Sequence, residues 1–211
     1  MEHTLLGLFE ACLSQTYNEL SGGGSFAVER RGDLLSIFFQ QSNGPLDWLN
    51  NLNFVAAPYR EMTPVWQCHA GFLKVWRSIR PHLERSVLDP SVGRIRTVGY
   101  SHGAALAVFC HEFAWYHRPD LRKSIQGFGF GCPRVLYGCL PPDVALRWEN
   151  FYIIRNLDDL ITHLPPRAAG YCHVGNLIEV GSEGAYSPID AHRPQNYLEA
   201  LKKIENNERL S

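Results

Sequence analysis

Residues 99–103 read Gly-Tyr-Ser-His-Gly and place a serine in the pattern G-x-S-x-G. The preceding residues, Arg94–Val98, alternate like a short strand, and Ala104–Tyr116 is rich in Ala, Leu and aromatic residues, which favours a helix. A turn between a strand and a helix holds such a serine in a strained conformation with its hydroxyl raised above the sheet, and it requires small neighbours. We therefore predict that Ser101 is a nucleophile, and that the start of the helix faces the oxyanion that its attack creates.

A serine hydroxyl needs a base within hydrogen-bond reach, and the base needs an acid that orients it. Two sites downstream fit the order Ser, Asp, His of the α/β-hydrolase arrangement. Asp158 and Asp159 follow a predicted strand at Phe151–Asn156, and His192 lies in a late loop. Each has an ordinary alternative: the aspartates as a helix N-cap or loop residues, and His192 as a solvated loop histidine.

The elements that must position these residues alternate between strands and helices. This alternation predicts an α/β fold, with a mostly parallel central sheet and helices on both faces. We expect Leu46–Leu52 to form a short helical turn and Asn53–Gln67, which holds two prolines, to be irregular. The predicted strands are Phe26–Arg30, Leu34–Phe39, Arg94–Val98, Ser124–Phe130, Phe151–Asn156 and His173–Val180, and the predicted helices lie within Met1–Leu20, Gly71–Glu84, Ala104–Tyr116 and Pro188–Asn206.

Length and charge exclude several classes of protein. The 211 residues are 45% hydrophobic, which suits one domain spanning residues 1–211. The 20 basic and 21 acidic residues give a net charge of -1 without a basic run, so we expect no nucleic-acid partner. No segment approaches the ~18 consecutive apolar residues of a membrane span. Residues 1–20 lack a basic start and carry three glutamates, which predicts a cytoplasmic protein, although a trimmed leader would leave secretion open.

The cysteines and histidines do not predict a metal site. Three Cys-His neighbours occur without a C-x-x-C or H-x-x-x-H pattern, so we expect neither a metal nor another cofactor. Free, mostly buried thiols are favoured over a disulfide bridge. The six cysteines are Cys12, Cys68, Cys110, Cys132, Cys139 and Cys172.

Seven segments, in order, resemble the fungal-type class 3 triacylglycerol lipases of the α/β-hydrolase superfamily. The motifs of that family are F-R-G-T leading into D-W-x-x-N-L, H-x-G-F, G-H-S-L-G-G-A-L, F-G-x-P-R, N-x-x-D-x-V-x-x-L-P-P, Y-x-H-x-G and H-x-x-Y. The corresponding segments here are 39–52, 69–72, 99–106, 130–134, 156–166, 171–175 and 192–198. Several motifs in the right order are far more specific than any one of them.

The resemblance implies a role for each candidate. It selects Asp159 over Asp158 as the acid, and His192 over His163 and His173 as the base, and it makes His173 structural. It also implies an oxyanion hole formed by Ser42 and by the backbone N–H of His102. The chain departs from the family where Gln40 and Gln41 replace Arg-Gly, which makes Ser42 the least secure of these assignments, and where the larger His102 replaces the usual leucine or glutamine.

The activity that the resemblance implies is hydrolysis of carboxylic esters, with acylglycerols or related lipid esters as substrates and transient contact with a lipid surface. An apolar flap over the acyl site is expected within Asn53–Gln67, with plain loop packing as its alternative. Two other functions stay open at this point. One is a catalytically silent binding module, and the other is a serine hydrolase of different specificity, such as a phospholipase or a thioesterase.

Overall fold

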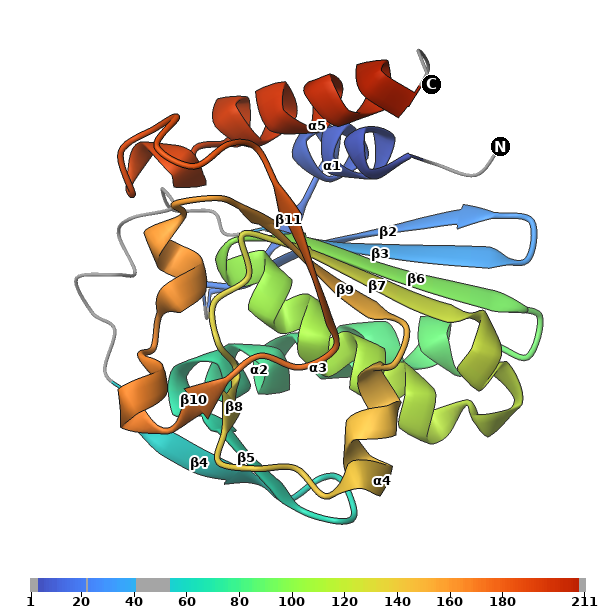
Figure 1. Ribbon diagram of the computed structural model, residues 1–211. Helices are drawn as coiled ribbons and strands as arrows, with labels where there is room; N and C mark the ends of the chain where they lie inside the picture. Colours follow the sequence, from blue (N-terminus) through green and yellow to red (C-terminus); the bar gives the residue numbers. More distant parts are fainter. Residues whose placement is uncertain (1–3, 22, 41–53, 209–211) are drawn as a thin grey trace.

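The computed structural model describes residues 4–21, 23–40 and 54–208. Its main feature is a seven-stranded sheet in the order β1-β2-β3-β6-β7-β9-β11 (Figure 1). The last five strands of this order are parallel, while β1 and β2 join antiparallel at one edge. The strands are β1 Asn18–Glu19, β2 Ser25–Arg31, β3 Leu34–Gln40, β6 Arg94–Tyr100, β7 Ile125–Phe130, β9 Phe151–Asn156 and β11 Asn176–Val180.

Helices cover both faces of this sheet, which confirms the predicted fold class. The helices α1 (Leu5–Ser14) and α5 (Pro194–Glu208) lie together on one face, and α2 (Ala70–Val87) and α3 (His102–His117) lie on the other (Figure 1). Each pair of helices packs on its own apolar cluster, so the sheet separates two cores.

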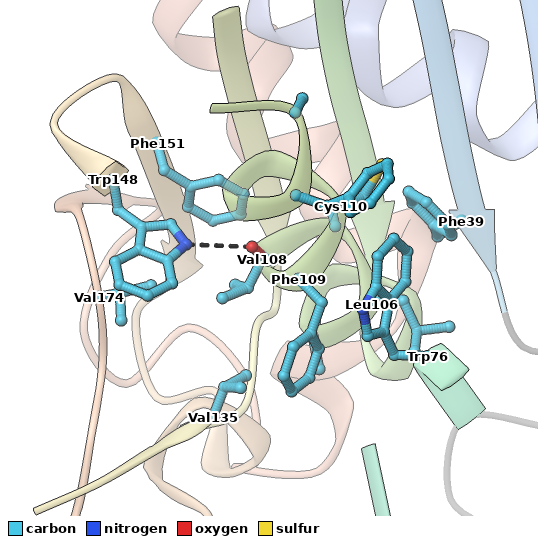
Figure 2. Packing of buried hydrophobic residues seen from close by; sticks show 14 of the residues in the cluster. Phe39, Trp76, Leu106, Val108, Phe109, Cys110, Val135, Trp148, Phe151 and Val174 are labelled. Atoms are coloured by element: carbon cyan, nitrogen blue, oxygen red, sulfur yellow. Dashed lines mark hydrogen bonds between the residues drawn. The ribbon is translucent and has the colours of Figure 1, made fainter. Parts of the chain in front are cut away.

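Helix α3 runs through the larger core. Its residues from 102 to 114 are all buried, as expected for a helix with apolar residues on every side. Large aromatic side chains pack around it, and the indole of Trp148 donates a hydrogen bond of 3.0 Å to the carbonyl of Val108 (Figure 2). Phe109 stacks between Trp66 and Trp76, with ring centroids 5.6 and 6.3 Å away. The helix that follows the predicted nucleophile is therefore anchored along most of its length.

A second, four-stranded sheet corrects the prediction that Asn53–Gln67 is irregular. Its order is β10-β8-β5-β4, and the antiparallel pair β4 (Ala56–Tyr59) and β5 (Trp66–His69) lies within or overlaps that range. The two prolines in this range argue against strands when the sequence is considered alone. Pro58 lies in β4, an edge strand where its missing N–H is tolerated, and Pro64 lies in the turn. The other strands are β8 Leu136–Tyr137 and β10 Tyr171–Cys172.

The side chains of this hairpin divide between the core and the surface. Tyr59 and Trp66 are buried with Met62 of the connecting turn, while Val55 and Val65 are about half exposed. The buried residues explain why the segment is ordered. Residues 41–53 lie outside the described part of the chain, including the predicted turn at Leu46–Leu52. The role of Asn53–Gln67 as a flap over the acyl site stays a prediction.

Several element boundaries also differ from those predicted. The last helix begins at Pro194, because a 3-10 turn, Asp190–His192, precedes it. The last strand begins at Asn176 rather than His173, because Gly175 turns the chain at a φ of +70°. Shorter elements are α4 Pro142–Ala145 and 3-10 turns at Pro119–Ser124, Leu146–Trp148, Leu160–His163 and Arg167–Ala169.

Two further properties were expected from the sequence. All six cysteines are free thiols, four of them buried, which confirms the interpretation of them as mostly buried thiols. Within the described ranges, no helix is both long and apolar enough to span a membrane.

Candidate active site

Ser101 lies in the turn between β6 and α3, with a φ of 57° and a ψ of -124°. A positive φ with this ψ is rare and strained for a residue with a side chain. The turn depends on two glycines. A Cβ at Gly99 would come within 2.2 Å of the Gly103 carbonyl oxygen, and a Cβ at Gly103 equally close to the carbonyl oxygen of Phe39. The backbone N–H of Ser101 donates to the carbonyl of Phe130 at 2.8 Å, which ties the turn to strand β7.

The side chain of His192 lies next to that of Ser101. Its Nε2 is 2.7 Å from Ser101 Oγ, and its Nδ1 is 2.8 Å from Asp159 Oδ2. Residues 101, 159 and 192 are each at most 3% exposed. The structure therefore brings together three side chains that are far apart in the chain, in the order nucleophile, base and acid that a serine hydrolase requires.

Asp159 is held by more than His192. It follows strand β9 and is the N-cap of the 3-10 turn Leu160–His163, where its Oδ1 accepts a 2.9 Å hydrogen bond from the N–H of Ile161. Its Oδ2 also accepts a 2.6 Å hydrogen bond from the hydroxyl of Tyr197. The capping role considered from the sequence and the contact with His192 thus belong to the same side chain. Asp158 points elsewhere and accepts from the N–H of Gly184 at 2.6 Å.

Tyr197 connects the carboxylate to the sheet. Its hydroxyl accepts a 3.0 Å hydrogen bond from the backbone N–H of Asn156, the last residue of β9, while it donates to Asp159. Burial and the neighbouring carboxylate raise the pKa of Tyr197, so the phenol keeps the proton that it donates. The sequence placed this tyrosine in a family segment, but its contact with Asp159 emerges only from the fold.

Glycine and a second histidine complete the surroundings of the three residues. Gly131 has a φ of +60°, and a Cβ there would come 2.8 Å from Cε1 of His192, so only glycine leaves room for the ring. His173 lies 2.9 Å from the carbonyl of Thr162 through Nε2, and the Thr162 hydroxyl donates to the carbonyl of Asp159 at 2.8 Å. Burial lowers the pKa of His173 to about 4, so the imidazole is neutral near neutral pH.

The ring of His163 lies next to Arg134, with Nδ1 3.5 Å from Nη2 of the guanidinium. The guanidinium of Arg134 donates to the backbone carbonyls of His163 and Pro165, and the N–H of Arg134 donates to the carbonyl of Leu164 at 2.7 Å. These bonds hold the loop that follows Asp159. Arg134 and His173 therefore both hold the chain segment that directly follows the acid.

The predicted oxyanion hole is described only in part. His102 is the first residue of α3, where backbone N–H groups point out of the helix and favour negative charge. Its side chain is buried, and this burial, together with nearby His69, lowers its pKa to about 4. Residues 41–53 lie outside the described residues, and they include Gln41 and Ser42. The role of Ser42 as an oxyanion donor therefore stays a prediction. In the described ranges, no three His, Cys, Asp or Glu side chains are grouped to hold a metal ion.

Comparison with known proteins decides the family. A family model described as "Lipase (class 3)" matches residues 36–169, more than half of the chain. The chain belongs to the class 3 lipase family. A curated lipase from Rhizomucor miehei is 30% identical over 159 residues, which is 71% of this chain and 43% of the relative. The chain therefore spans less than half the length of that relative.

Solved lipase structures share the α/β-hydrolase fold of this chain. The triacylglyceride lipase of Rhizomucor miehei superposes with a TM-score of 0.68 at 24% identity, covering 80% of this chain and 66% of that one. Lipase II from Rhizopus niveus gives a TM-score of 0.64 at 21% identity, covering 78% and 64%. At these identities the likeness establishes the fold, and the chemistry must come from the site.

Proposed function

We propose that this protein is a serine hydrolase that cleaves carboxylic esters through Ser101, His192 and Asp159. The observation that carries the proposal is the pair of contacts at 2.7 and 2.8 Å that joins the three side chains. The placement of Ser101 at the start of α3 adds to it, because a helix N-terminus favours the negative charge of an oxyanion. A triacylglycerol lipase whose catalytic centre is formed by a serine protease triad superposes on this chain with a TM-score of 0.68.

The geometry supports a two-step reaction. Ser101 Oγ attacks the ester carbonyl while His192 Nε2 accepts the hydroxyl proton, and the N–H of His102 stabilises the tetrahedral oxyanion. The N–H of Ser42 is the second donor that the family resemblance implies. His192 then donates the proton to the departing alcohol, which leaves an acyl group on Ser101. Water attacks the acyl-enzyme by the same route and releases the carboxylic acid. Asp159 holds the imidazole in place and stabilises its charged form.

We further propose lipid esters, acylglycerols foremost, as the substrates, and transient contact with a lipid surface. The family and the names of the relatives above support this class of substrate. Single-domain organisation over residues 1–211 and a cytoplasmic location belong to the same proposal. Fractionation of cells that express the tagged full-length protein tests the location.

A substrate panel tests the function. The purified protein is given p-nitrophenyl esters of increasing chain length, an acylglycerol emulsion, a phospholipid and an acyl thioester, with Ser101→Ala as the matched control. We expect hydrolysis of the oxygen esters, lost by at least about a thousandfold in Ser101→Ala. Preference for the phospholipid or the thioester would replace the proposed substrate class, and no turnover with any of them would support a silent binding module.

A further inference from the structure

Tyr100 contacts both the side chain and the main chain of His192. It is the last residue of β6, directly before Ser101, and it is 3% exposed. Its ring stacks on the imidazole with centroids 5.2 Å apart and planes 21° from parallel. Its hydroxyl donates a short hydrogen bond to the backbone carbonyl of His192. One side chain therefore contacts both the imidazole ring and the turn that carries it.

The imidazole is held on several sides. Its two nitrogens face Ser101 and Asp159, its Cε1 faces Gly131, and the ring of Tyr100 covers one of its faces. Tyr100 is itself fixed from behind by Phe9 of α1, whose ring meets it edge-on at 5.5 Å. The face of the imidazole is thus supported by a packed aromatic side chain rather than by solvent.

This arrangement has a chemical consequence during acyl transfer. His192 is neutral before it accepts the proton of Ser101 and cationic afterwards. The face of an aromatic ring within about 6 Å attracts a cation, and exclusion of water strengthens the attraction. The stack therefore favours the state in which the proton has moved, while the hydroxyl keeps Nε2 aimed at Ser101.

We propose that Tyr100 is a positioning residue for His192, acting through its ring on the protonated imidazole and through its hydroxyl on the backbone of residue 192. The inference rests on the proposed function, because it assumes that His192 is the base. It predicts an effect on kcat rather than on KM, since neither contact involves the substrate.

The test uses Tyr100→Phe, which keeps the ring, and Tyr100→Met, which keeps an apolar side chain without the ring. Turnover of p-nitrophenyl butyrate is divided by the concentration of active sites, titrated with a fluorophosphonate. We expect kcat to fall about three- to tenfold in the Phe variant and about ten- to a hundredfold in the Met variant. KM should stay within about twofold of the wild-type value in both.

Tyr152→Met is the matched control. Tyr152 packs against the same core on the neighbouring part of the sheet, but it stacks on Phe128, at 5.6 Å, and not on His192. Its kcat per active site should stay within about twofold of wild type. If Tyr152→Met loses as much kcat as Tyr100→Met, the loss reflects general packing, and the inference is overturned.

Other outcomes separate this inference from the proposed function. Wild-type kcat in both Tyr100 variants, or equal kcat in Phe and Met, would overturn the role of the ring. If Tyr100→Met does not fold, the Phe variant still tests the hydroxyl, and Tyr100→Trp, which restores an aromatic face, should retain more kcat than any apolar variant that folds. Activity that survives Ser101→Ala would instead overturn the proposed function, whatever the Tyr100 variants do.

Discussion

Among the residues that the structure describes, two carboxylates, Asp159 and Glu112, are fully buried, and their partners are very different. Asp159 lies just beyond the carboxyl end of β9, where it accepts hydrogen bonds from an imidazole, a phenol and a backbone N–H. Glu112 lies in α3 within the larger core, where it pairs with Arg147 at 2.5 Å and accepts from the indole of Trp66 at 2.9 and 3.1 Å.

The difference lies in what the partners can do with a proton. The imidazole of His192 can both accept and donate a proton, and its second nitrogen reaches a hydroxyl. A guanidinium and an indole only donate. Arg147 extends further to the carbonyl of Thr63, at 2.7 Å, and so ties α3 to the β4–β5 hairpin. Both carboxylates are therefore buried, and their partners distinguish the catalytic role proposed for Asp159 from the structural role of Glu112.

The largest expected effect comes from exchanging each carboxylate for its amide. Asp159→Asn should lower kcat for p-nitrophenyl butyrate by about 10⁴-fold, because the amide no longer orients the imidazole or stabilises its charge. Glu112→Gln should leave kcat per active site within about threefold, and its effect should fall on stability instead. Steady-state kinetics and urea unfolding of both variants measure this. A comparable loss of kcat in the two variants would erase the distinction.

Removing one partner of the buried ion pair tests the structural role of Glu112. Arg147→Met leaves Glu112 buried without its cation and should cost about 3–5 kcal/mol of unfolding free energy. The double variant Glu112→Leu/Arg147→Met should be more stable than Arg147→Met, because no unpaired charge remains. Equilibrium urea unfolding measures all three variants. A double variant less stable than Arg147→Met alone would contradict the account.

A change in pH should alter the stability contributions of Glu112 and of His173 in opposite directions. Burial raises the pKa of Glu112 from 4.5 to about 7, against the opposing effect of Arg147. The folded state then holds this proton more tightly, so the stability contribution is full below pH 4.5 and is lost as the pH rises through 7. Relative to Glu112→Gln, the wild type should lose up to about 3 kcal/mol across this window.

His173, which supports Asp159 through Thr162, should show the reverse. Its pKa falls from 6.5 to about 4, so its contribution is present above pH 6.5 and is lost as the pH falls through 4. Relative to His173→Gln, which keeps a donor for the Thr162 carbonyl, the wild type should lose roughly 2–3 kcal/mol. Urea unfolding at a series of pH values measures both differences, and slopes of the same sign would contradict the comparison.

The smallest expected effect concerns the second donor to Asp159. Tyr197→Phe removes the hydroxyl that donates to the carboxylate and accepts from the N–H of Asn156. We expect kcat to fall about tenfold and stability by about 1–3 kcal/mol. Tyr59→Phe is the control, because its hydroxyl accepts from Trp76 at 2.8 Å in the other core. It should lose stability while kcat per active site changes little.

The sequence predicted the parts of this molecule that depend on local pattern. Strand β9 has the predicted bounds, and the strand, turn and helix around Ser101 follow from alternation and small residues. The hairpin β4–β5 was missed because Pro58 is a breaker by local rules, and only the sheet order reveals that it lies at an edge.

The site, too, could be predicted only as far as local pattern and the family resemblance reach. Residue order alone left two aspartates open and named His192 as the histidine. The family resemblance then selected Asp159 over Asp158, and His192 over His163 and His173. Tyr100 gave no signal, since the second position of G-x-S-x-G admits many residues. Glu112 could have been noticed as a lone charge in the apolar stretch Ala104–Tyr116, but the sequence does not say that Arg147 pairs with it. Contacts between distant segments come only from the fold.

The most direct test of the account is covalent labelling with a fluorophosphonate, followed by peptide mapping with mass spectrometry. The account predicts one adduct on Ser101 in the wild type, no adduct at that peptide in Ser101→Ala, and labelling at least about a hundredfold slower in His192→Ala. An adduct on a different residue, or equal labelling rates in the wild type and His192→Ala, would contradict it.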